Sequence, residues 1–429
     1  MFEGNLYENH EKITVVGAGK TGLAVVDFLD ERKVDLFVTE SNKLKSEIKN
    51  TFRKRGVKYE EDGHSRRALD TDLLVVSPGV PLDLDLIKRG RKMGIPVIGE
   101  IELAYRLSPT DRIVGVTGTN GKSTTVNLIT ELLKYGGERP VACGNIGKPF
   151  IEAIASLTPS DVAVVEVSSY QLQTTKRFKP KVAVLTNLEP DHLKRHGSFE
   201  KYRKIKLKIF ENQQEEDYAV LNKKLNLEIE NREPTRIEYE PSSPSRLKLT
   251  PHESDNVGAA LTAANCILEG RSFNYPPVKP VRRGLNLPHR LESVSTIAGI
   301  EFVDDSKATN PAATIAAIEG LEKPTRILLG GKAKKASYDK LAERIQTSSV
   351  RATYLFGSAQ PALAEILRKK GITDFENCST LEKAVETAFE DSAPNEVVLL
   401  SPGCSSFDRF ANFEERGEKF KETVKSLTN

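Results

Sequence analysis

One glycine-rich loop limits the possible folds of this chain more than any other feature. The run from Gly115 to Thr124 reads GVTGTNGKST and begins inside the apolar segment Arg112–Thr117. Such a turn between a strand and a helix suits a polyphosphate, because backbone N–H groups and the helix N-terminus converge on the anion. Lys122 is expected to reach the β- and γ-phosphates and Ser123 to ligate Mg²⁺. Val116 replaces the first glycine of the strict pattern, so this is a variant loop; the alternative is a glycine-rich turn with an incidental lysine.

Short apolar segments alternate with helical stretches along the whole chain, which predicts α/β folding with parallel sheets. At about 150 residues per domain, 429 residues give about three domains. The expected strands fall into three series. They are Lys12–Val16, Leu36–Val38 and Leu73–Ser77; then Arg112–Thr117, Val162–Val167 and Val182–Leu185; then Glu301–Asp304, Ile327–Leu329, Ala352–Phe356 and Val397–Leu400.

Helices are expected at Leu23–Leu29, around Tyr202–Phe210 and at Asn256–Leu268. The polar, proline-broken stretch Asn226–Thr250 predicts loops or a small side sheet. Asn274–Pro280 is either a linker or the end of a packed helix. We therefore predict three domains: a Rossmann-like one at 1–98, a phosphate-loop mononucleotide-binding one at 99–285 and a second Rossmann-like one at 286–429.

Composition excludes several other classes of protein. Hydrophobic residues make up 38% and charged residues 29%, which rules out a disordered or low-complexity chain. No apolar run approaches the roughly 18 residues of a membrane span, and the first residues do not resemble a signal peptide. A net charge of +3 gives no footprint for nucleic acid or a membrane surface. The four cysteines lack C-x-x-C spacing, so we expect no zinc site, no disulfide framework and a reducing cytoplasm.

A second glycine motif lies at Gly17, Gly19 and Gly22, between the first strand and the first helix. It resembles a dinucleotide fingerprint, and Glu40 follows near the end of the second strand, where a ribose contact would fall. Three interpretations remain open: a nicotinamide or flavin site, a site for another nucleotide such as a UDP-sugar, and a turn without a ligand. An NAD enzyme would not need the phosphate loop a hundred residues later.

Acidic and imidazole side chains follow the next two strands of the second series. Glu166 ends the segment VAVVEV, where a carboxylate can hold Mg²⁺ directly or through water, although a solvated acid is the simpler alternative. His192 and His196 are four residues apart but do not form the H-E-x-x-H zinc pattern. We expect His192, beside Asp191, to be functional and His196 to be structural. The lysines of 201–208 mostly suit a solvated helix face.

Two polar clusters in the third series also follow strands. One is Asp304–Pro311, reading DDSKATNP, and the other is Ser401–Asp408, reading SPGCSSFD. Both should lie at the carboxyl ends of parallel strands, where open α/β sheets bind ligands. No histidine lies near Cys404 in the sequence, so a thiol nucleophile is not expected.

These motifs together resemble the Mur ligase family over nearly the whole chain. GTNGKST, EVSSYQL, TNLEPDHLKRHG, LPHR, DDSKATNP and LSPGCSSFDRF occur in that order, and NFEERG follows at 412–417. The combination is most similar to the branch that joins D-glutamate to UDP-N-acetylmuramoyl-L-alanine. Folylpolyglutamate synthases share the phosphate-loop style but not an N-terminal UDP-binding module of this sort.

The resemblance implies an ATP-dependent ligase of peptidoglycan precursor synthesis that works through an acyl phosphate, with ATP and two Mg²⁺ ions. It implies UDP-N-acetylmuramoyl-L-alanine and D-glutamate as substrates, and a monomer without nucleic-acid or membrane partners. Lys206 matches a carbamylated lysine, whose CO₂ adduct provides oxygen ligands for Mg²⁺. The adduct forms on a neutral amine, so this lysine should lie where its pKa is lowered.

The residues that the resemblance implies fall into four sets. The catalytic set is Lys122, Glu166, His192 and Lys206, and the metal ligands are Ser123, Glu166, His192 and Lys206. The ATP set is Gly118, Thr119, Asn120, Gly121, Lys122, Ser123, Thr124, Asn256, Arg290 and Asp305. The UDP-sugar set is Gly17, Gly19, Lys20, Thr21, Glu40, Ser77, Gly79, Asn145, Ser168 and His192. The amino-acid set is Lys307, Thr309, Lys334, Ser406, Phe407 and Phe413.

Three positions depart from the family's pattern. Lys332 replaces an acid in the run Gly330–Lys334, Glu253 replaces an asparagine, and the loop Thr39–Ser41 lacks a basic residue. The first departure makes the expected amino-acid pocket more cationic. The alternatives are a Mur ligase with another acceptor, a folylpolyglutamate synthase-like ligase, a dinucleotide-dependent oxidoreductase, and a nucleotide-binding regulator without catalysis.

Overall fold

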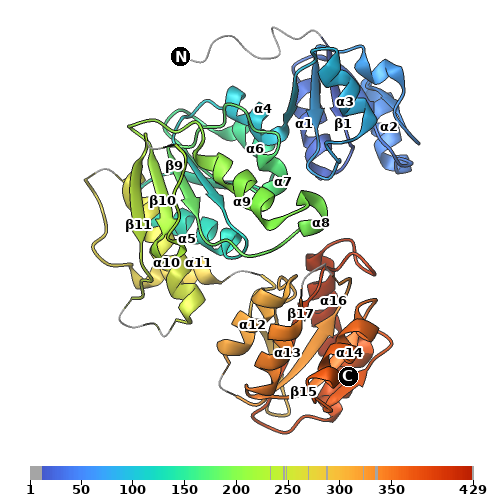
Figure 1. Cartoon of the computed structure of the whole chain (residues 1–429), viewed down its shortest axis with the longest axis vertical. Helices are drawn as coiled ribbons and strands as arrows, with labels where there is room; N and C mark the ends of the chain where they lie inside the picture. The colour runs from blue at the N-terminus through green and yellow to red at the C-terminus, as the bar shows by residue number, and fades with distance from the viewer. Residues whose placement is uncertain are drawn as a thin grey trace. The chain divides into compact units, whose positions relative to one another are not determined.

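Three β-sheets, one for each predicted series, organise the chain (Figure 1). The computed structural model describes residues 12–427 except 232, 245–246, 248, 269, 287, 322 and 334–336. Helices accompany each sheet, so the chain is an α/β protein of three domains, as predicted.

The first sheet is entirely parallel and is covered on both faces. Its order is β3 (Lys58–Glu60), β2 (Asp35–Thr39), β1 (Lys12–Val16), β4 (Leu73–Val76) and β5 (Val97–Gly99). The helices are α1 (Lys20–Asp30), α2 (Ser46–Arg55) and α3 (Asp85–Lys92), with a 3₁₀ turn, η1, at Arg66–Leu69. Val15 packs in one core with Leu29 of α1, and Val16 packs in another with Leu86 of α3. Burial of both faces explains the continuous apolar strands.

The second sheet is also entirely parallel. Its order is β11 (Thr235–Tyr239), β10 (Tyr218–Asn222), β9 (Val182–Leu185), β6 (Ile113–Thr117), β8 (Val162–Glu166) and β7 (Pro140–Gly144). The helices of this part are α4 (Glu100–Leu107), α5 (Lys122–Tyr135), α6 (Phe150–Ala153), α7 (Ser169–Leu172), α8 (Leu193–His196), α9 (Phe199–Leu207), α10 (Pro251–Ile267) and α11 (Val278–Leu285). Its 3₁₀ turns are η2 (Ile154–Ser156), η3 (Lys208–Phe210) and η4 (Lys223–Leu225).

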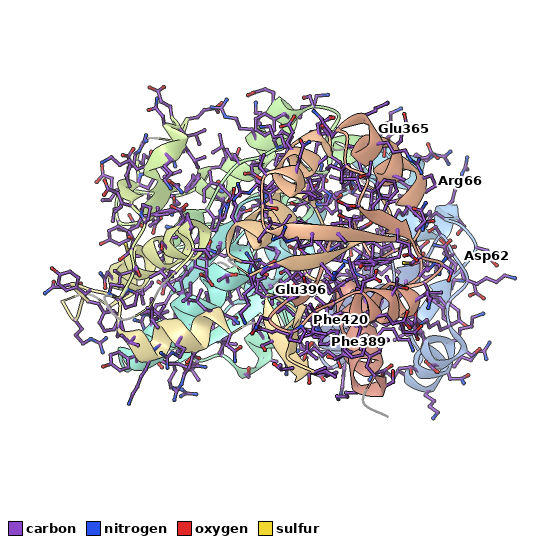
Figure 2. All side chains as sticks on the ribbon, turned by 90° about the horizontal axis from the view of Figure 1, so that it is seen from below. Asp62, Arg66, Glu365, Phe389, Glu396 and Phe420 are labelled. Atoms are coloured by element: carbon purple, nitrogen blue, oxygen red, sulfur yellow. The ribbon has the colours of Figure 1, made fainter. Side chains whose placement is uncertain are left out.

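The third sheet is parallel except for its first strand. Its order is β12 (Glu292–Ile297), β13 (Ile300–Asp304), β17 (Val397–Gly403), β14 (Thr325–Gly330), β15 (Val350–Phe356) and β16 (Phe375–Asn377), with β12 antiparallel to β13. The helices are α12 (Pro311–Glu319), α13 (Asp339–Gln346), α14 (Gln360–Lys369), α15 (Leu381–Glu390) and α16 (Phe413–Ser426). Leu399 and Leu341 share one core, while Leu400 packs on the other face with Phe389 and Phe420, both labelled in Figure 2.

The three sheets form two compact units. The first contains the first two sheets, because one apolar core runs through Leu29 of α1, Ile101 of α4, Phe150 of α6 and Val165 of β8. The second unit contains 189–202, 249–253 and the third sheet. The predicted boundaries at 98/99 and 285/286 stay predictions.

Most expected strands are confirmed, including Lys12–Val16 and Val182–Leu185 at their predicted ends. The described residues of Asn226–Thr250 are mostly loops, as predicted, but its one strand, β11, extends the main second sheet and does not form a side sheet. Its side chains are mostly exposed, so an edge strand of this kind shows little apolar signal. The first helix begins at Lys20 rather than Leu23, and helix α11 begins inside the expected linker at Val278. In the described part of the chain, no helix is both long and apolar enough to span a membrane.

A buried arginine ties together the strand ends of the third sheet. Arg416 of α16 is 0% exposed and donates to Ser306 Oγ at 3.0 Å, Ser306 O at 2.8 Å and Cys404 O at 3.1 Å. Burial lowers the pKa of Arg416 to about 10, so the side chain remains a cation at neutral pH. It therefore holds the loop after β13 against the loop after β17.

Arg416→Met should destabilise the second unit by about 3 kcal/mol or more, because several buried oxygens lose a charged donor. Urea unfolding followed by tryptic cleavage within residues 285–427 measures the effect. Arg351→Met is the matched control, since Arg351 is exposed on β15, and it should change stability by less than about 0.5 kcal/mol. Equal stability of the two variants would contradict the assigned role.

A buried carboxylate links two helices of the first unit, α4 and α6. Glu100, the first residue of α4, is 2% exposed and its Oε1 accepts the Ile151 N–H of α6 at 2.7 Å. Its Oε2 has no hydrogen-bond partner among the described residues. Burial raises the pKa of Glu100 to about 7, despite the opposing N–H donors of Ile151 and Phe150.

Stability should therefore depend on pH through Glu100. Its pKa is about 7 in the folded chain and about 4.3 when unfolded, so its contribution is present below pH 4 and lost as pH rises through 7. Relative to the parent, Glu100→Gln should raise the melting temperature strongly at pH 8 and much less at pH 5. The gain in the free energy of unfolding should differ between the two pH values by up to about 3 kcal/mol. Glu152→Gln, at an exposed acid of α6, should show no such difference. A shift of equal size at both pH values would refute the assignment to Glu100.

Candidate functional site

The phosphate loop has a backbone shape that only glycine accommodates at two positions. Gly118 has φ +148° and Gly121 has φ +80°, both in the region that side chains disfavour. A Cβ on Gly118 would lie 1.9 Å from Thr186 Oγ1, and one on Gly121 would lie 2.2 Å from Asn256 Oδ1. The loop therefore leads from β6 into the 14-residue helix α5 in one tight conformation. The N-terminal N–H groups of α5 favour an anion there.

Two residues after β9 hold the loop, and the sequence interpretation missed both. Asn187 Oδ1 accepts the Asn120 N–H at 2.8 Å, and Asn187 O accepts the Thr119 N–H at 3.1 Å. Thr186 Oγ1 donates to Asn120 O at 2.7 Å. Both residues open the run TNLEPDHLKRHG, directly after an apolar strand, but the sequence analysis assigned them no role.

The two charged side chains expected beside the phosphates both contact the loop. Lys122 Nζ donates to Gly118 O at 2.9 Å and to Thr119 O at 2.8 Å, so the ammonium lies back across the loop. Lys206 is 2% exposed, and its Nζ donates to Gly118 O at 2.7 Å and to Thr117 Oγ1 at 3.4 Å. The structure thus brings Lys206 to the start of the phosphate loop from 88 residues away.

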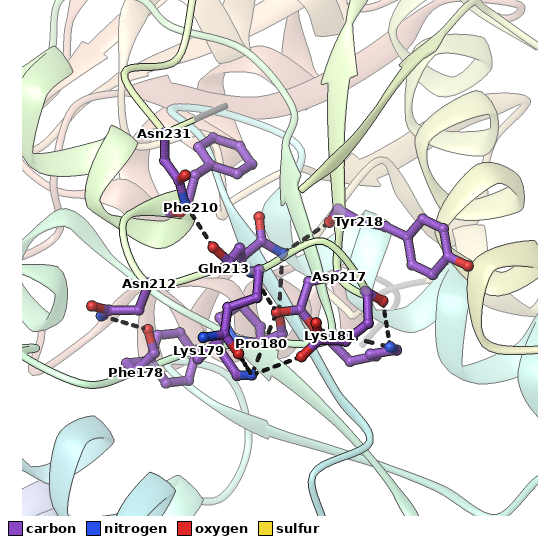
Figure 3. A network of polar contacts seen from close by, with 12 residues as sticks. Phe178, Lys179, Pro180, Lys181, Phe210, Asn212, Gln213, Asp217, Tyr218 and Asn231 are labelled. Carbon is purple, nitrogen blue, oxygen red and sulfur yellow. Dashed lines mark hydrogen bonds and ion pairs between the residues drawn. The ribbon is translucent and has the colours of Figure 1, made fainter. Parts of the chain in front are cut away.

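A polar network anchors the segment that follows Lys206 (Figure 3). Gln213 Nε2 donates to Pro180 O and Tyr218 O, each at 3.0 Å. Asn231 Nδ2 donates to Phe210 O at 2.9 Å and to Gln213 O at 2.7 Å. Because these bonds fix η3 against β9 and β10, they also fix the end of α9 that carries Lys206.

Ser123 and Glu166, predicted as metal ligands, are in direct contact. Ser123 Oγ donates to Glu166 Oε2 at 2.6 Å, and Asn145 Nδ2 donates to Glu166 Oε1 at 2.9 Å. Glu166 is 2% exposed. A buried carboxylate beside a hydroxyl provides the hard oxygen ligands that Mg²⁺ prefers, so this pair fits the ion.

The two histidines of the LEPDHLKRHG run belong to the second unit. His192 has φ +53°, and its Nε2 lies 3.4 Å from Asp191 Oδ2. Its roles as a metal ligand beside Glu166 and as a UDP-sugar contact stay predictions. His196 is buried, with its ring 5.3 Å from that of Tyr202, which agrees with a structural role.

A cavity of about 540 Å³ lies within the first unit, at the carboxyl ends of the first sheet. Eight of the ten residues predicted to bind a UDP-sugar line it: Gly17, Gly19, Lys20, Thr21, Glu40, Ser77, Gly79 and Asn145. Residues that the prediction missed also line it, among them Asn42, His64, Gly147 and Gln171. Ser168 instead caps α7, where it accepts the Gln171 N–H and donates to Gln171 Oε1 at 2.8 Å.

The glycines of the turn between β1 and α1 differ in what surrounds them. A Cβ on Gly22 would lie 1.9 Å from Gly17 O, so α1 packs directly on the end of β1. Gly19 has nothing within 4 Å of its hypothetical Cβ, which leaves space for a ligand to approach the backbone. Ser77 Oγ donates to Gly17 O at 2.8 Å, and Lys20 Nζ donates to Gly147 O at 2.6 Å.

Glu40 shapes the same loop from the end of β2. Its Oε2 accepts the Ala18 N–H at 2.8 Å, and its Oε1 accepts the Asn42 N–H at 3.1 Å. Partial burial alone would raise the pKa of Glu40, but these N–H donors hold it below its usual value. The carboxylate is thus ionised and bonded to the glycine loop, and its role as a ribose contact stays a prediction.

In the second unit, two adjacent aspartates follow β13. Asp305 accepts from Ser401 Oγ at 2.7 Å, and burial raises its pKa to about 7, against the opposing charge of Arg290. Asp304 Oδ2 lies 2.7 Å from His289 Nδ1, a buried contact that the sequence interpretation missed. His289 precedes Arg290, so this pair fixes the segment that carries the predicted ATP-binding arginine.

The predicted amino-acid residues gather at the same edge of the third sheet. Lys307 Nζ lies 4.9 Å from the centre of the Phe413 ring, and Phe413 O accepts from Ser306 Oγ at 2.8 Å. Ser406 is buried, whereas Phe407 is 68% exposed. Thr309 follows β13 in the loop before α12, and Lys334 lies outside the described residues. Lys332 pairs with Ser405 through backbone bonds of 2.8 and 3.1 Å.

Three family models match the chain in succession. They are the MurD-like N-terminal domain at 11–99, the Mur ligase middle domain at 116–262 and the Mur ligase, glutamate ligase domain at 289–404. Curated relatives include the UDP-N-acetylmuramoylalanine–D-glutamate ligases of Koribacter versatilis, 38% identical over 97% of this chain and 98% of that protein, and of Clostridioides difficile, 33% identical over 97% and 99%.

Solved structures share the fold at lower identity. The UDP-N-acetylmuramate–alanine ligase of Thermotoga maritima has a TM-score of 0.58 at 19% identity, covering 97% of this chain and 99% of its own. The MurF ligase of the same organism, in complex with ADP, has a TM-score of 0.59 at 17% identity, covering 91% and 95%. The chain therefore belongs to the Mur ligase family, in the branch of the UDP-N-acetylmuramoylalanine–D-glutamate ligases.

Proposed function

We propose that this chain joins D-glutamate to UDP-N-acetylmuramoyl-L-alanine with ATP as the energy source. The observation that carries the proposal is the contact of Glu166 with both Ser123 and Asn145. Ser123 belongs to the phosphate loop, and Asn145 lines the cavity at the carboxyl ends of the first sheet, here called the nucleotide cavity. A single carboxylate thus links a site for ATP phosphates to a site for a UDP-sugar, which a phosphorylation of that sugar's carboxylate requires. The names of the relatives supply the identity of both substrates.

The reaction divides into two balanced steps. The L-alanyl carboxylate oxygen attacks the γ-phosphorus of ATP, and the bond to the bridging oxygen breaks, which gives an acyl phosphate and ADP. The amine nitrogen of D-glutamate then attacks the acyl carbon, and the tetrahedral intermediate expels phosphate, leaving an amide and releasing one proton. Phosphorylation is needed because a carboxylate alone has no adequate leaving group.

The residues of the phosphate loop provide the charge balance for the first step. Two anions must meet, and Lys122 can exchange its bonds to Gly118 O and Thr119 O for the β- and γ-phosphate oxygens. The N–H groups at the start of α5 bind the same phosphates. Asn256, which contacts the loop at Gly121, is proposed to bind ATP, and so are Arg290 and Asp305 of the second unit.

Ser123 and Glu166 are proposed to hold one Mg²⁺ ion, with His192 and a carbamylated Lys206 at a second. Bound Mg²⁺ supplies positive charge that neutralises the phosphate oxygens. Lys206 fits the carbamate because its amine is buried against the neutral oxygens of Gly118 and Thr117. The carboxyl edge of the third sheet, with Lys307, Thr309, Ser406, Phe407 and Phe413, is proposed to bind D-glutamate. We further propose a monomer that works in the cytoplasm, where ATP and UDP-sugars occur.

A coupled phosphate-release assay tests the proposal. The chain with UDP-N-acetylmuramoyl-L-alanine, ATP and Mg²⁺ should release phosphate only when D-glutamate is added, and Lys122→Ala should lower kcat/KM by about 100-fold or more. Parallel reactions contain L-glutamate, L-alanine, meso-diaminopimelate or dihydropteroate with L-glutamate. Release with one of these acceptors but not with D-glutamate would contradict the assigned substrate, and NADH-dependent redox activity would contradict the reaction class.

Replacement of Lys206 tests the carbamate separately. Lys206→Ala should lower kcat by about 1,000-fold, because the carbamate oxygens are lost, and formate or acetate should restore part of the activity while bicarbonate should not. Lys204→Ala is the control, since Lys204 is exposed on the same helix, and it should retain full activity. Turnover like that of the parent in Lys206→Ala would remove the carbamate from the mechanism.

A further inference from the structure

His64 stands in the nucleotide cavity without a role in the proposed reaction. It follows β3, is half-buried and lines the cavity with Glu40, Ser41 and Asn42. Asp62 and Arg66, labelled in Figure 2, flank it in the sequence and are exposed. His64 is therefore the ring of this turn that a ligand in the cavity can reach.

A chain of hydrogen bonds fixes the proton on the His64 ring. Thr39 Oγ1 lies 2.7 Å from Glu60 Oε1 and 2.7 Å from His64 Nδ1. Thr39 and Glu60 are opposed in the pairing of β2 with β3, so this geometry is built into the sheet. The Thr39 hydroxyl carries a single proton, which can satisfy only one of the two contacts.

The ionisation of Glu60 decides which contact receives that proton. Partial burial alone would raise the pKa of Glu60, but hydrogen bonds from Ser65 and Thr39 hold it below its usual value. An ionised carboxylate only accepts, so the Thr39 hydroxyl must donate to Glu60. Thr39 Oγ1 then accepts from His64 Nδ1–H. In the neutral ring the proton is on Nδ1, and Nε2 is an acceptor that no described residue hydrogen-bonds.

The position of His64 in the cavity indicates which part of the ligand it meets. The diphosphate is expected at the glycine loop and the start of α1. The sugar and its alanyl group must extend toward Asn145, which contacts Glu166 at the phosphate loop. The base is then left at the opposite end, beyond Glu40 at the carboxyl ends of β2 and β3. His64 lies at that end.

We propose that His64 selects the uracil base, with its Nε2 accepting a hydrogen bond from uracil N3–H. The inference rests on the proposed UDP-sugar substrate. Uracil carries a donor at N3, whereas cytosine carries a lone pair there, and two acceptors facing each other repel. The Glu60–Thr39–His64 chain thus converts a neutral histidine into an acceptor of fixed orientation. Glu60 and Thr39 are positioning residues, and His64 is the contact.

The test compares two replacements, each of which retains a polar atom near one of the two ring nitrogens. His64→Asn retains a donor near Nδ1 for Thr39 but loses the acceptor at Nε2, whereas His64→Gln can place its amide oxygen near Nε2. Calorimetry at pH 8 measures the dissociation constants of UDP, CDP and 3-methyluridine diphosphate. It reports the preference for the base without any turnover. The parent should bind UDP about 10-fold more tightly than the other two. His64→Asn should bind all three within about 3-fold, and His64→Gln should recover most of the preference.

Controls separate this inference from the proposed function and from a folding defect. Arg66→Ala, at an exposed neighbour, should keep the full preference. In the ligase assay, His64→Asn should raise the KM for the UDP-sugar about 10-fold with kcat within about 2-fold. Equal binding of UDP and CDP by the parent, or an unchanged preference in His64→Asn, would overturn the role of His64 while ligase activity persists. Absence of ligase activity in a parent that still prefers UDP would overturn the proposed function alone.

Discussion

The hydrogen bond between Ser123 and Glu166 is the contact on which the arrangement of both nucleotide sites depends. At 2.6 Å, it joins the first turn of α5 to the end of β8, the neighbour of β6 in the second sheet. Glu166 also binds Asn145, and its backbone carbonyl accepts the Asn145 N–H at 2.9 Å. The phosphate loop and the wall of the nucleotide cavity are therefore set by one residue.

Parallel pairing explains how residues far apart in the sequence reach these sites. In the second sheet β6 lies between β8 and β9, so the segments after all three strands emerge at one edge. Those segments carry the phosphate loop, Ser168 and Asn187 respectively. In the third sheet β17 lies between β13 and β14, which brings Ser306 and Cys404 close enough for Arg416 to bind both. Each site thus occupies the position where open α/β sheets bind ligands.

The sequence predicted those parts of the site that depend on local pattern. Glycine spacing located both loops, and a carboxylate at the end of an apolar strand located Glu166. The parts that it missed depend on register between distant segments. Thr39 faces Glu60 only because β2 pairs with β3, a three-residue strand whose residues are mostly polar. His289 meets Asp304 only after β12 turns back along β13. The sequence did not predict β11, because its mostly exposed side chains show no apolar alternation.

Two acidic residues, Glu40 and Glu166, occupy equivalent places beside the two glycine loops. Their hydrogen-bond partners differ, and so does their ability to bind a ligand. Glu40 is bonded to the backbone N–H groups of Ala18 and Asn42, and releasing them would leave loop donors unsatisfied. Glu166 is bonded to the side chains of Ser123 and Asn145, so loss of these two bonds leaves no backbone donor unsatisfied. A cation can therefore replace the side-chain bonds of Glu166 while its backbone carbonyl keeps the Asn145 N–H. The carboxylate of Glu40, in contrast, is bonded to backbone donors of its own loop. A glutamate beside a glycine turn thus binds backbone N–H groups in the first domain, where it is Glu40. In the second domain the corresponding glutamate, Glu166, can bind a ligand.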